Sequence, residues 1–531
     1  MRKIFIILTS LPLLVIAQQT QSAAQDTFNF NNVKTIVGSG AMMWDNLNKL
    51  FEIPKGSDKH TIFAHDFWIG GIDEGGQLRV AAQTYRQNGA DFWAGPCSDP
   101  IHHNDIDMGL WDRVWKINKT EIDYHITNFN SSNYIMLEAI ETWPAHGDIN
   151  MGQSENLAPF VDVDNDGIYN PSTGDYPQIK GDQAIYFIRN DIGNVHTEYG
   201  GEKLGIEQHI MFYGYRCNNY PELNNALFVN MKLYNRGEYN LQNMYVGTWT
   251  DVDLGYYIDD YIGCNVPLNL GYVYNGDSID EGQNGYGTNP PTQGVVYLNQ
   301  NMSKFFYYWG SPTFVGNPDN AQDIYYFLQG RWKNGQHLMF GANGLGAGSP
   351  GSTTDSCSYF FPGTTDPDFP EQDWTEYTAE NTPFDRRFLQ SHGPIDLPAN
   401  SSFNLDYAFI FAWDSTGING GSLPLLFSYT QSIQDFYDGS SIILCENEEI
   451  PITWNCINDN CVDPNDGTGL YNSLPQCQTS CSQTAVNELL QNKKKLTKII
   501  NLLGKETFQK TNTPLFYIYD DGSVEKRFVI D

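Results

Sequence analysis

Residues 227–237 read LFVNMKLYNRG, and this stretch decides the fold class of the chain. Apolar side chains occupy every second position from its start, at Leu227, Val229, Met231 and Leu233. A period of two is that of a β-strand with one buried face. The closing Asn-Arg-Gly is a turn signal, and residues 244–250, MYVGTWT, form the next candidate strand. The two segments therefore predict a hairpin or a meander.

Comparable short runs recur along the chain, at residues 80–85, 184–189, 294–298, 324–328 and 405–412. Only residues 423–437 and 484–495 have the pattern of a helix. Aromatic residues make up 14% of the chain, and no internal repeat of the length of a propeller blade is visible. We therefore predict an all-β protein, built as one large β-sandwich or two, with long loops.

The N-terminus carries an export signal. Two basic residues precede an apolar run over residues 4–16, and Ala17 offers a small-residue cleavage site. A membrane-spanning helix would need about 20 apolar residues, and the polar residues from Gln18 onward end the run too early. We therefore expect residues 1–17 to be a signal peptide for export through the periplasm, and we expect no transmembrane segment in the mature chain.

The chain is strongly acidic, with a formal net charge of −33 that becomes −35 once the two basic residues of the signal peptide are removed. Such a charge makes nucleic acid a poor partner. The carboxylates lie among loops rich in Asp, Gly and Asn rather than in one acidic block. This distribution favours a solvated surface with cation sites over disorder.

Composition divides the chain into further parts after the signal peptide. We expect residues 18–30 to be a linker and residues 31–445 to be a β-rich body, with a candidate subdivision near residue 220. Residues 446–485 form a small cysteine-rich module, and residues 486–531 form a C-terminal domain.

Nine cysteines in an exported chain are expected to be largely oxidised. The informative group consists of Cys456, Cys461, Cys477 and Cys481. Their spacing is similar to that of a zinc ribbon, but the export route favours two disulfides, in any of three pairings. A segment with so little apolar sequence needs such links for stability. Whether Cys445 belongs to this module stays open, as do the pairs among the four cysteines before it.

The clearest chemical motif is DVDNDGIYN, residues 162–170. Asp162, Asp164 and Asp166 stand at positions one, three and five of a loop with Gly167 at position six, which is the ligand spacing of a calcium loop. The glycine permits the sharp turn that brings the carbonyl of Ile168 inward. The alternative is an Asx-rich turn that binds no metal.

A complete EF-hand would carry a bidentate glutamate at position twelve, where this chain has Thr173. Asp175, two positions later, could replace it only in a loop of different shape. Pro159 and Pro171 bracket the motif, so the flanking helices of an EF-hand are not expected. We therefore predict a structural calcium loop of the kind found in extracellular modules, which pins a long connection.

A second acidic group follows the candidate strand over residues 244–250 and contains Asp251, Asp253 and Asp259. These carboxylates either bind a cation or cap turns. Paired carboxylates also serve glycoside hydrolysis, which requires a defined separation across a sugar. No nucleophile elbow, phosphate loop or dinucleotide motif stands in a fitting context, so no catalytic residue is assigned.

Aromatic residues offer candidate platforms for a ligand, at Trp93, Tyr256, Tyr257 and residues 305–309. A flat ring can stack on the apolar face of a ligand. The alternative is that these rings fill the β core.

The tail, residues 515–530, reads LFYIYDDGSVEKRFVI, and it predicts two alternating strands, residues 515–519 and 524–530, joined at Asp521-Gly522, a dipeptide suited to a tight hairpin. With Leu503-Gly504-Lys505 upstream, it resembles the type A C-terminal sorting domain of cargo of the type IX secretion system of Bacteroidota. The resemblance implies an interaction with that secretion machinery and delivery to the cell surface or the medium.

Segments of the body are similar to a set of secreted Bacteroidota proteins that carry this sorting domain and have no assigned activity. These segments are FWIGG (67–71), AAQTYR (81–86), GDYPQIKGDQA (174–184), TWTDVD (248–253) and DRRF (385–388). The resemblance implies a shared fold and location, and it contributes no catalytic residues.

Together these observations predict an exported, noncatalytic protein that binds calcium structurally, with a glycan or another extracellular surface ligand as a candidate partner. Two alternatives stay open. One is a secreted polymer hydrolase that uses paired carboxylates, and the other is a structural subunit of a surface assembly.

Overall fold

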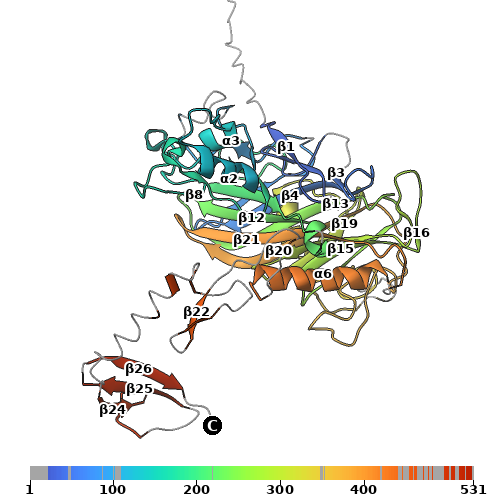
Figure 1. The fold of residues 1–531 in the computed structure, drawn as a ribbon. Helices are drawn as coiled ribbons and strands as arrows, with labels where there is room; N and C mark the ends of the chain where they lie inside the picture. The colour runs from blue at the N-terminus through green and yellow to red at the C-terminus, as the bar shows by residue number, and fades with distance from the viewer. Residues whose placement is uncertain are drawn as a thin grey trace, which may run out of the picture. The chain divides into compact units, whose positions relative to one another are not determined.

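The computed structural model divides the chain into two compact units, Met1–Glu446, which we call the body, and Asn447–Asp531. The structure describes residues 22–45, 50–86, 88–99, 101, 109–217, 219–346, 351, 353–418, 421–440, 445, 454–457, 460–462, 470–471, 476–477, 481, 495–501, 504–508, 513–520 and 522–528. The predicted signal peptide lies outside these ranges, as does the predicted helix over residues 484–495 except for its last residue. Figure 1 shows two large sheets in the body.

The larger sheet has nine strands among the described residues, and its neighbouring strands are antiparallel. In spatial order they are β14 (Asp260–Asn265), β15 (Leu270–Asn275), β18 (Thr292–Tyr297), β21 (Ser402–Ala412), β12 (Ala226–Asn235), β11 (Ile206–Gly214), β10 (Gln183–Asn190) and β6 (Trp93–Ala94), with β7 (Trp115–Asn118) also paired to β10. Because β11 and β12 pair with each other across residue 220, the sheet is continuous at the candidate subdivision.

The smaller sheet has six strands in the described part of the body. In spatial order they are β19 (Lys304–Tyr308), β20 (Arg386–Leu397), β13 (Leu241–Val252), β4 (His60–Ile72) and β3 (Leu50–Glu52), with β5 (Leu78–Ala82) also paired to β4. The all-β, sandwich-like class predicted from the sequence is therefore confirmed.

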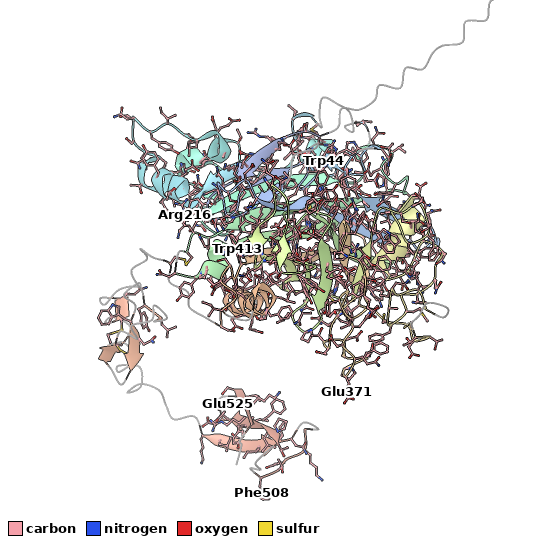
Figure 2. All side chains as sticks on the ribbon, turned by 90° about the vertical axis from the view of Figure 1, so that its right-hand side faces the viewer. Trp44, Arg216, Glu371, Trp413, Phe508 and Glu525 are labelled. Atoms are coloured by element: carbon pink, nitrogen blue, oxygen red, sulfur yellow. A yellow bond between two sulfur atoms is a disulfide. The ribbon has the colours of Figure 1, made fainter. Side chains whose placement is uncertain are left out.

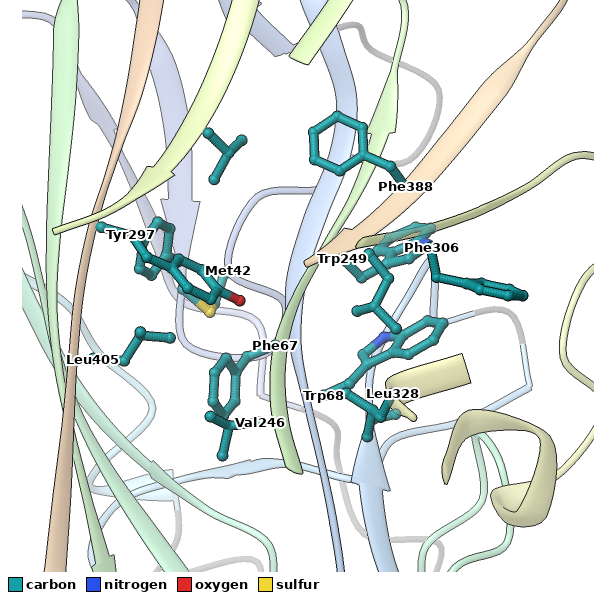
Figure 3. Packing of buried hydrophobic residues seen from close by; sticks show 14 of the residues in the cluster. Met42, Phe67, Trp68, Val246, Trp249, Tyr297, Phe306, Leu328, Phe388 and Leu405 are labelled. Atoms are coloured by element: carbon teal, nitrogen blue, oxygen red, sulfur yellow. The ribbon is translucent and has the colours of Figure 1, made fainter. Parts of the chain in front are cut away.

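The core lies between the two sheets. Figure 3 shows Phe67 and Val246 of the smaller sheet facing Tyr297 and Leu405 of the larger sheet, while Trp68 points to the opposite side of β4. This is the alternation that a strand imposes on successive side chains. Helix α6 (Ser422–Tyr437) covers the outer face of the larger sheet, in agreement with the predicted helix.

The strands formed by the segments at residues 227–237 and 244–250 do not pair with each other as predicted. Strand β12 pairs with β11 and β21, whereas β13 pairs with β4 and β20, so they lie in different sheets and form no hairpin. The turn residue Arg236 donates its backbone N–H to the carbonyl of Gly205, on the connection before β11, at 2.8 Å. This contact continues the pairing of β12 with the chain before β11 by one residue, and β13 then begins in the other sheet.

Residues 324–328, predicted as a strand, belong to helix α5 (Ala321–Leu328). The side chain of Asn320 caps this helix by accepting from the backbone N–H groups of Gln322 and Asp323. Ile324, Phe327 and Leu328 are buried at helical spacing. Helix α2 (Lys119–Asn128), which the sequence analysis did not find, begins with a capping box between Asn118 and Glu121.

The remaining elements are short. They are β1 (Gln25–Phe28), β2 (Thr35–Gly38), α3 (Glu138–Glu141), η2 (Ile149–Met151), β8 (Phe160–Val161), η3 (Pro171–Thr173), β9 (Tyr176–Pro177), α4 (Pro221–Asn224), β16 (Ile279–Asp280) and β17 (Gly287–Thr288). Because β1 pairs with β2, the segment expected to be a linker contains a strand. Among the described residues, no helix has the length and apolar character needed to cross a membrane.

The second unit contains the β22 (Asn455–Ile457) and β23 (Asn460–Val462) pair and a sheet of β24 (Leu496–Ile500), β25 (Pro514–Tyr519) and β26 (Val524–Phe528). The predicted C-terminal hairpin is confirmed, because β25 and β26 are antiparallel partners. Strand β24, which the sequence analysis did not identify, adds to β25.

The two disulfides predicted for the cysteine-rich module are present, and their pairing is Cys456–Cys481 and Cys461–Cys477. Cys445 instead pairs with Cys217 of the body. The three other cysteines of the described body, Cys97, Cys264 and Cys357, are buried and free.

Candidate functional site

The predicted calcium loop connects β8 to β9, two short strands that pair with each other. One carboxylate oxygen from each of Asp162, Asp164 and Asp166 lies within 4.8 Å of the other two. Asp164 and Asp166 are exposed and Asp162 is half-buried, so the three oxygens form a cluster that solvent can reach. The spacing read from the sequence therefore does bring these three side chains together.

The loop is shaped by its own side chains. Asp162 accepts from the backbone N–H of Asn165 at 2.7 Å and from that of Gly167 at 2.8 Å. Asp166 accepts from the N–H of Ile168 at 2.7 Å. Gly167 has a φ of 82°, which favours glycine. The hydrogen bond from Gly167, the strongest influence, lowers the pKa of Asp162, so this carboxylate is charged at neutral pH.

Asp175 does not join the three carboxylates. Its side chain is buried, and its two oxygens accept from the N–H groups of Val163 and Asn170, each at 2.8 Å. These bonds tie the two ends of the loop together. The side chain of Ile168, whose carbonyl was predicted to face the ion, is exposed. Asp175 is therefore a structural support of the loop rather than a ligand in the cluster.

The structure divides the second predicted group. Asp251 and Asp253 each place a carboxylate oxygen within 4.8 Å of one from Asp385, whereas Asp259 lies outside this cluster. Asp251 accepts from the hydroxyl of Tyr85 at 2.6 Å, and its other oxygen lies 3.5 Å from Nε of Arg387. A cation at this cluster would compete with the guanidinium of Arg387, which makes it less suited to calcium than the loop of Asp162.

Four of the five body segments singled out by resemblance meet at this cluster. Trp68 stacks on Trp249 with ring centroids 6.0 Å apart, and Tyr85 meets the Trp249 ring edge-on at 5.2 Å. Arg387 then donates to the hydroxyl of Tyr85 at 2.7 Å. The sequence analysis assigned no role to Tyr85, Arg387 or Asp385, although each lies in one of the segments that are similar to secreted Bacteroidota proteins.

Asp259 lies near two further buried acids. Burial raises the pKa of Asp259 to about 7 and that of Asp260 well above its ordinary value. Asp280 accepts from the N–H groups of Tyr256 at 3.0 Å and Tyr286 at 2.7 Å, which closes the loop around it. The carboxylates of Asp259, Asp260 and Asp280 therefore belong to hydrogen-bonded turns. None of the three is a member of the cluster that contains Asp251.

The ionisation of Asp251 should make the stability of the body depend on pH. Burial raises the pKa of Asp251 from 3.8 to about 6, so the folded state holds this proton more tightly than the unfolded state. The free energy of unfolding therefore falls as the pH rises through the interval from about 4 to 6, by at most about 3 kcal/mol from this group. We expect the free energy of unfolding, measured with urea, to fall less or rise more over this interval in Asp251→Asn than in the unchanged protein.

The exposed residue Asp355 supplies the control for this experiment. Asp355→Asn should keep the slope of the unchanged protein. If Asp251→Asn also keeps that slope, the assignment of the pH dependence to Asp251 is wrong.

Most of the candidate aromatic platforms belong to the core. Trp93 and residues 305–308 are buried, so they offer no ring to a ligand. Tyr257 is 44% exposed and remains accessible. The body instead presents a hollow of about 540 Å³ between α6 and the neighbouring loops of the larger sheet. Side chains that end in carboxamides line much of it, namely Asn269, Asn299, Gln300, Asn301, Gln431 and Gln434.

Fold and side chains of the described residues together define an all-β, disulfide-containing protein with two groups of three close carboxylates, and Arg387 lies beside the group that contains Asp251. Neither a protein-family model nor a curated protein sequence matches the chain.

Proposed function

We propose that this is an exported, noncatalytic protein whose body binds calcium at the loop of Asp162, Asp164 and Asp166. The observation that carries the proposal is the meeting of three carboxylate oxygens within 4.8 Å on a loop already turned by its own hydrogen bonds. Three charges at this spacing repel one another, and calcium, which takes six to eight oxygen ligands, would remove the repulsion. The role is structural, because the ion would pin the connection between β8 and β9.

Calcium should therefore raise the melting temperature of the mature chain after removal of metal with a chelator. At a calcium concentration of 100 times the Kd, binding to the folded state alone adds about 2.7 kcal/mol to the free energy of unfolding. Asp164→Ala should abolish the calcium-dependent rise, which differential scanning calorimetry would measure. Asp164 is chosen because its side chain is exposed and accepts a long bond of 3.3 Å from the N–H of Asp166, so its loss should leave the loop folded.

The matched control is Asp355→Ala, which removes an exposed carboxylate elsewhere in the body. This variant should keep the full response to calcium. A melting temperature that does not move at millimolar calcium, or a shift that survives in Asp164→Ala, would contradict the assignment.

Export to the cell surface or the medium is the second part of the proposal. It is supported by the apolar run over residues 4–16 and by the hairpin of β25 and β26, whose sequence resembles a type IX sorting domain. Mass spectrometry of the mature termini in periplasm, surface and medium fractions tests it. A surface or medium form that starts near Gln18 and lacks the tail supports the proposal, and an intact tail on a periplasmic form overturns it.

A neutral glycan is a second candidate ligand of this exported protein, and the carboxamide-lined hollow beside α6 favours it. Gln300 donates its side-chain N–H to the carbonyl of Asn404, and Gln434 donates to that of Leu298, each at 3.0 Å. These bonds leave the two amide oxygens to accept hydrogen bonds from ligand hydroxyl groups. The volume is within the range of small-ligand sites.

Electrophoresis through gels that contain soluble β-glucan, mannan or xylan would test this candidate. We expect one of these polymers to retard the mature chain, and we expect Gln431→Leu to reduce the retardation several-fold because it removes an amide from the hollow. Equal mobility in all three gels would reject the glycan.

The hydrolase alternative has less support. Asp251 and Asp253 are only 2% and 8% exposed, and a glycosidase needs both carboxylates open to a sugar that lies between them.

A further inference from the structure

The long connection between β19 and β20 forms a hollow of about 370 Å³ on the body, which we call the acidic hollow. Part of its wall is apolar and comes from Phe340, Ala342, Trp374 and Ala379. The polar part includes three exposed side chains, those of Gln372, Asp373 and Glu380. No lysine, arginine or histidine is among the described residues that line it, and it shares no lining residue with the hollow beside α6.

The sequence around the acidic hollow carries negative charge alone. Residues 338–385 contain no lysine, arginine or histidine, and their eight acids are Asp355, Asp366, Asp368, Glu371, Asp373, Glu376, Glu380 and Asp385. Two of these acids form ion pairs with arginines of β20, Glu376 with Arg386 at 2.8 Å and Asp385 with Arg387 at 3.0 Å. In the described part of the chain, the side chains of Asp373 and Glu380 form no hydrogen bond or ion pair. These two carboxylates are therefore available to a ligand.

The loop that carries the two carboxylates is anchored in the body. Glu376, which lies between them in the sequence, is fully buried, pairs with Arg386 and accepts from the backbone N–H of Ile262 on β14 at 2.8 Å. Nε1 of Trp374 donates to the carbonyl of Ala342 at 3.0 Å, and this bond joins two walls of the acidic hollow. A ligand would therefore meet a backbone that is already ordered, which reduces the entropic cost of binding.

We propose that the acidic hollow binds a primary ammonium group on a short aliphatic chain, as in a free diamine or a lysine side chain. Such a group carries three N–H donors and no acceptor. The carboxylates of Asp373 and Glu380 and the amide oxygen of Gln372 offer acceptors, two of them charged, which strengthens the hydrogen bonds. The apolar part of the wall suits the aliphatic carbons, which gain free energy when they leave water.

A divalent metal ion and a neutral sugar fit this hollow less well. Calcium takes six to eight oxygen ligands, and among the described residues neither Asp373 nor Glu380 belongs to a group of three close ligand atoms. A neutral sugar would bring no positive charge to the two carboxylates. The combination of unpaired carboxylates with an apolar wall therefore favours an organic cation.

Saturation-transfer NMR on the full mature chain tests the proposal with cadaverine, Nα-acetyl-lysine methylamide and the uncharged analogue 1,5-pentanediol. Physiological salt screens the general attraction of cations to this acidic chain. We expect the methylene signals of both amines to receive saturation from the protein, and those of pentanediol to receive none. The amine that binds more tightly in a titration identifies the source of the ammonium group, cadaverine a free amine and the lysine derivative a protein side chain.

Two double variants locate the binding. Asp373→Asn with Glu380→Gln keeps the shapes of the side chains, removes both charges and should weaken the binding of either amine by about five-fold or more. The matched control is Asp355→Asn with Glu371→Gln, which removes two exposed acids of the same segment that do not line the hollow. Figure 2 shows Glu371 projecting from the surface of the body. The control should keep the affinity of the unchanged protein. Equal saturation of pentanediol, unchanged affinity in the first variant or an equal loss in the control overturns the proposal.

Discussion

Replacing Asp66 by asparagine is expected to lower the free energy of unfolding of the body by about 3–5 kcal/mol. Asp66 on β4 pairs with Arg189 on β10 at 2.7 Å, so this ion pair joins the two sheets, and both side chains are fully buried. Asparagine keeps the shape but removes the charge, which leaves the guanidinium buried and unpaired. Urea unfolding followed by the fluorescence of the buried tryptophans would measure the loss.

The surface pair of Lys333 and Asp319 supplies the control, because Asp319 is 74% exposed. Asp319→Asn should cost less than about 1 kcal/mol. The double variant with Asp66→Leu and Arg189→Met removes both charges together and should lose less stability than Asp66→Asn alone. A loss below about 1 kcal/mol in Asp66→Asn would contradict the view that this pair holds the sheets together.

Features that depend on neighbours in the sequence could be predicted. The alternation over residues 227–233 requires a half-buried strand, and β12 is that strand. The turn at Asp162 is formed by hydrogen bonds between residues three and five positions apart. The local sequence is therefore enough to determine how its carboxylates are arranged. The hairpin of β25 and β26 is likewise local.

Features that depend on distant partners could not be predicted. A period of two shows that one face of β13 is buried, but it does not tell which sheet the strand joins. The partner of Ala226 in β12 is Ile410, which lies far along the chain. The strand predicted at residues 324–328 is a helix because its cap at Asn320 and its packing on β4 outweigh its β-branched and aromatic residues.

The same reason explains what was missed at the candidate sites. Tyr85, Asp251 and Arg387 lie in three separate segments, and only the folding of β13 against β4 and β20 brings them together. Asp385 reaches the cluster of Asp251 by the same route. The ion pair of Asp66 and Arg189 spans 123 residues, and no local pattern in the sequence marks it.

Removing the disulfide between Cys217 and Cys445 with the double variant Cys217→Ser and Cys445→Ser should also destabilise the body strongly. The two cysteines are 228 residues apart. In the chain-entropy description, a cross-link over a loop of this length restricts the unfolded chain by roughly 5 kcal/mol, and measured losses are commonly 2–5 kcal/mol. We expect a lower melting temperature in calorimetry, and a reductant should produce the same shift in the unchanged protein.

The place of this disulfide indicates which part of the body would open first. Cys217 follows β11 and Cys445 follows α6, whose Phe436 packs on Tyr215 with ring centroids 5.1 Å apart. Without the link, packing and a few side-chain hydrogen bonds hold the end of α6 to the larger sheet, among them the bond from the hydroxyl of Tyr437 to Asp406, so amide hydrogens near Phe436 should exchange faster than those of β12. The matched control removes Cys456–Cys481 in the second unit, and it should leave the melting of the body unchanged. Equal melting temperatures for both double variants would show that the body does not depend on its own disulfide.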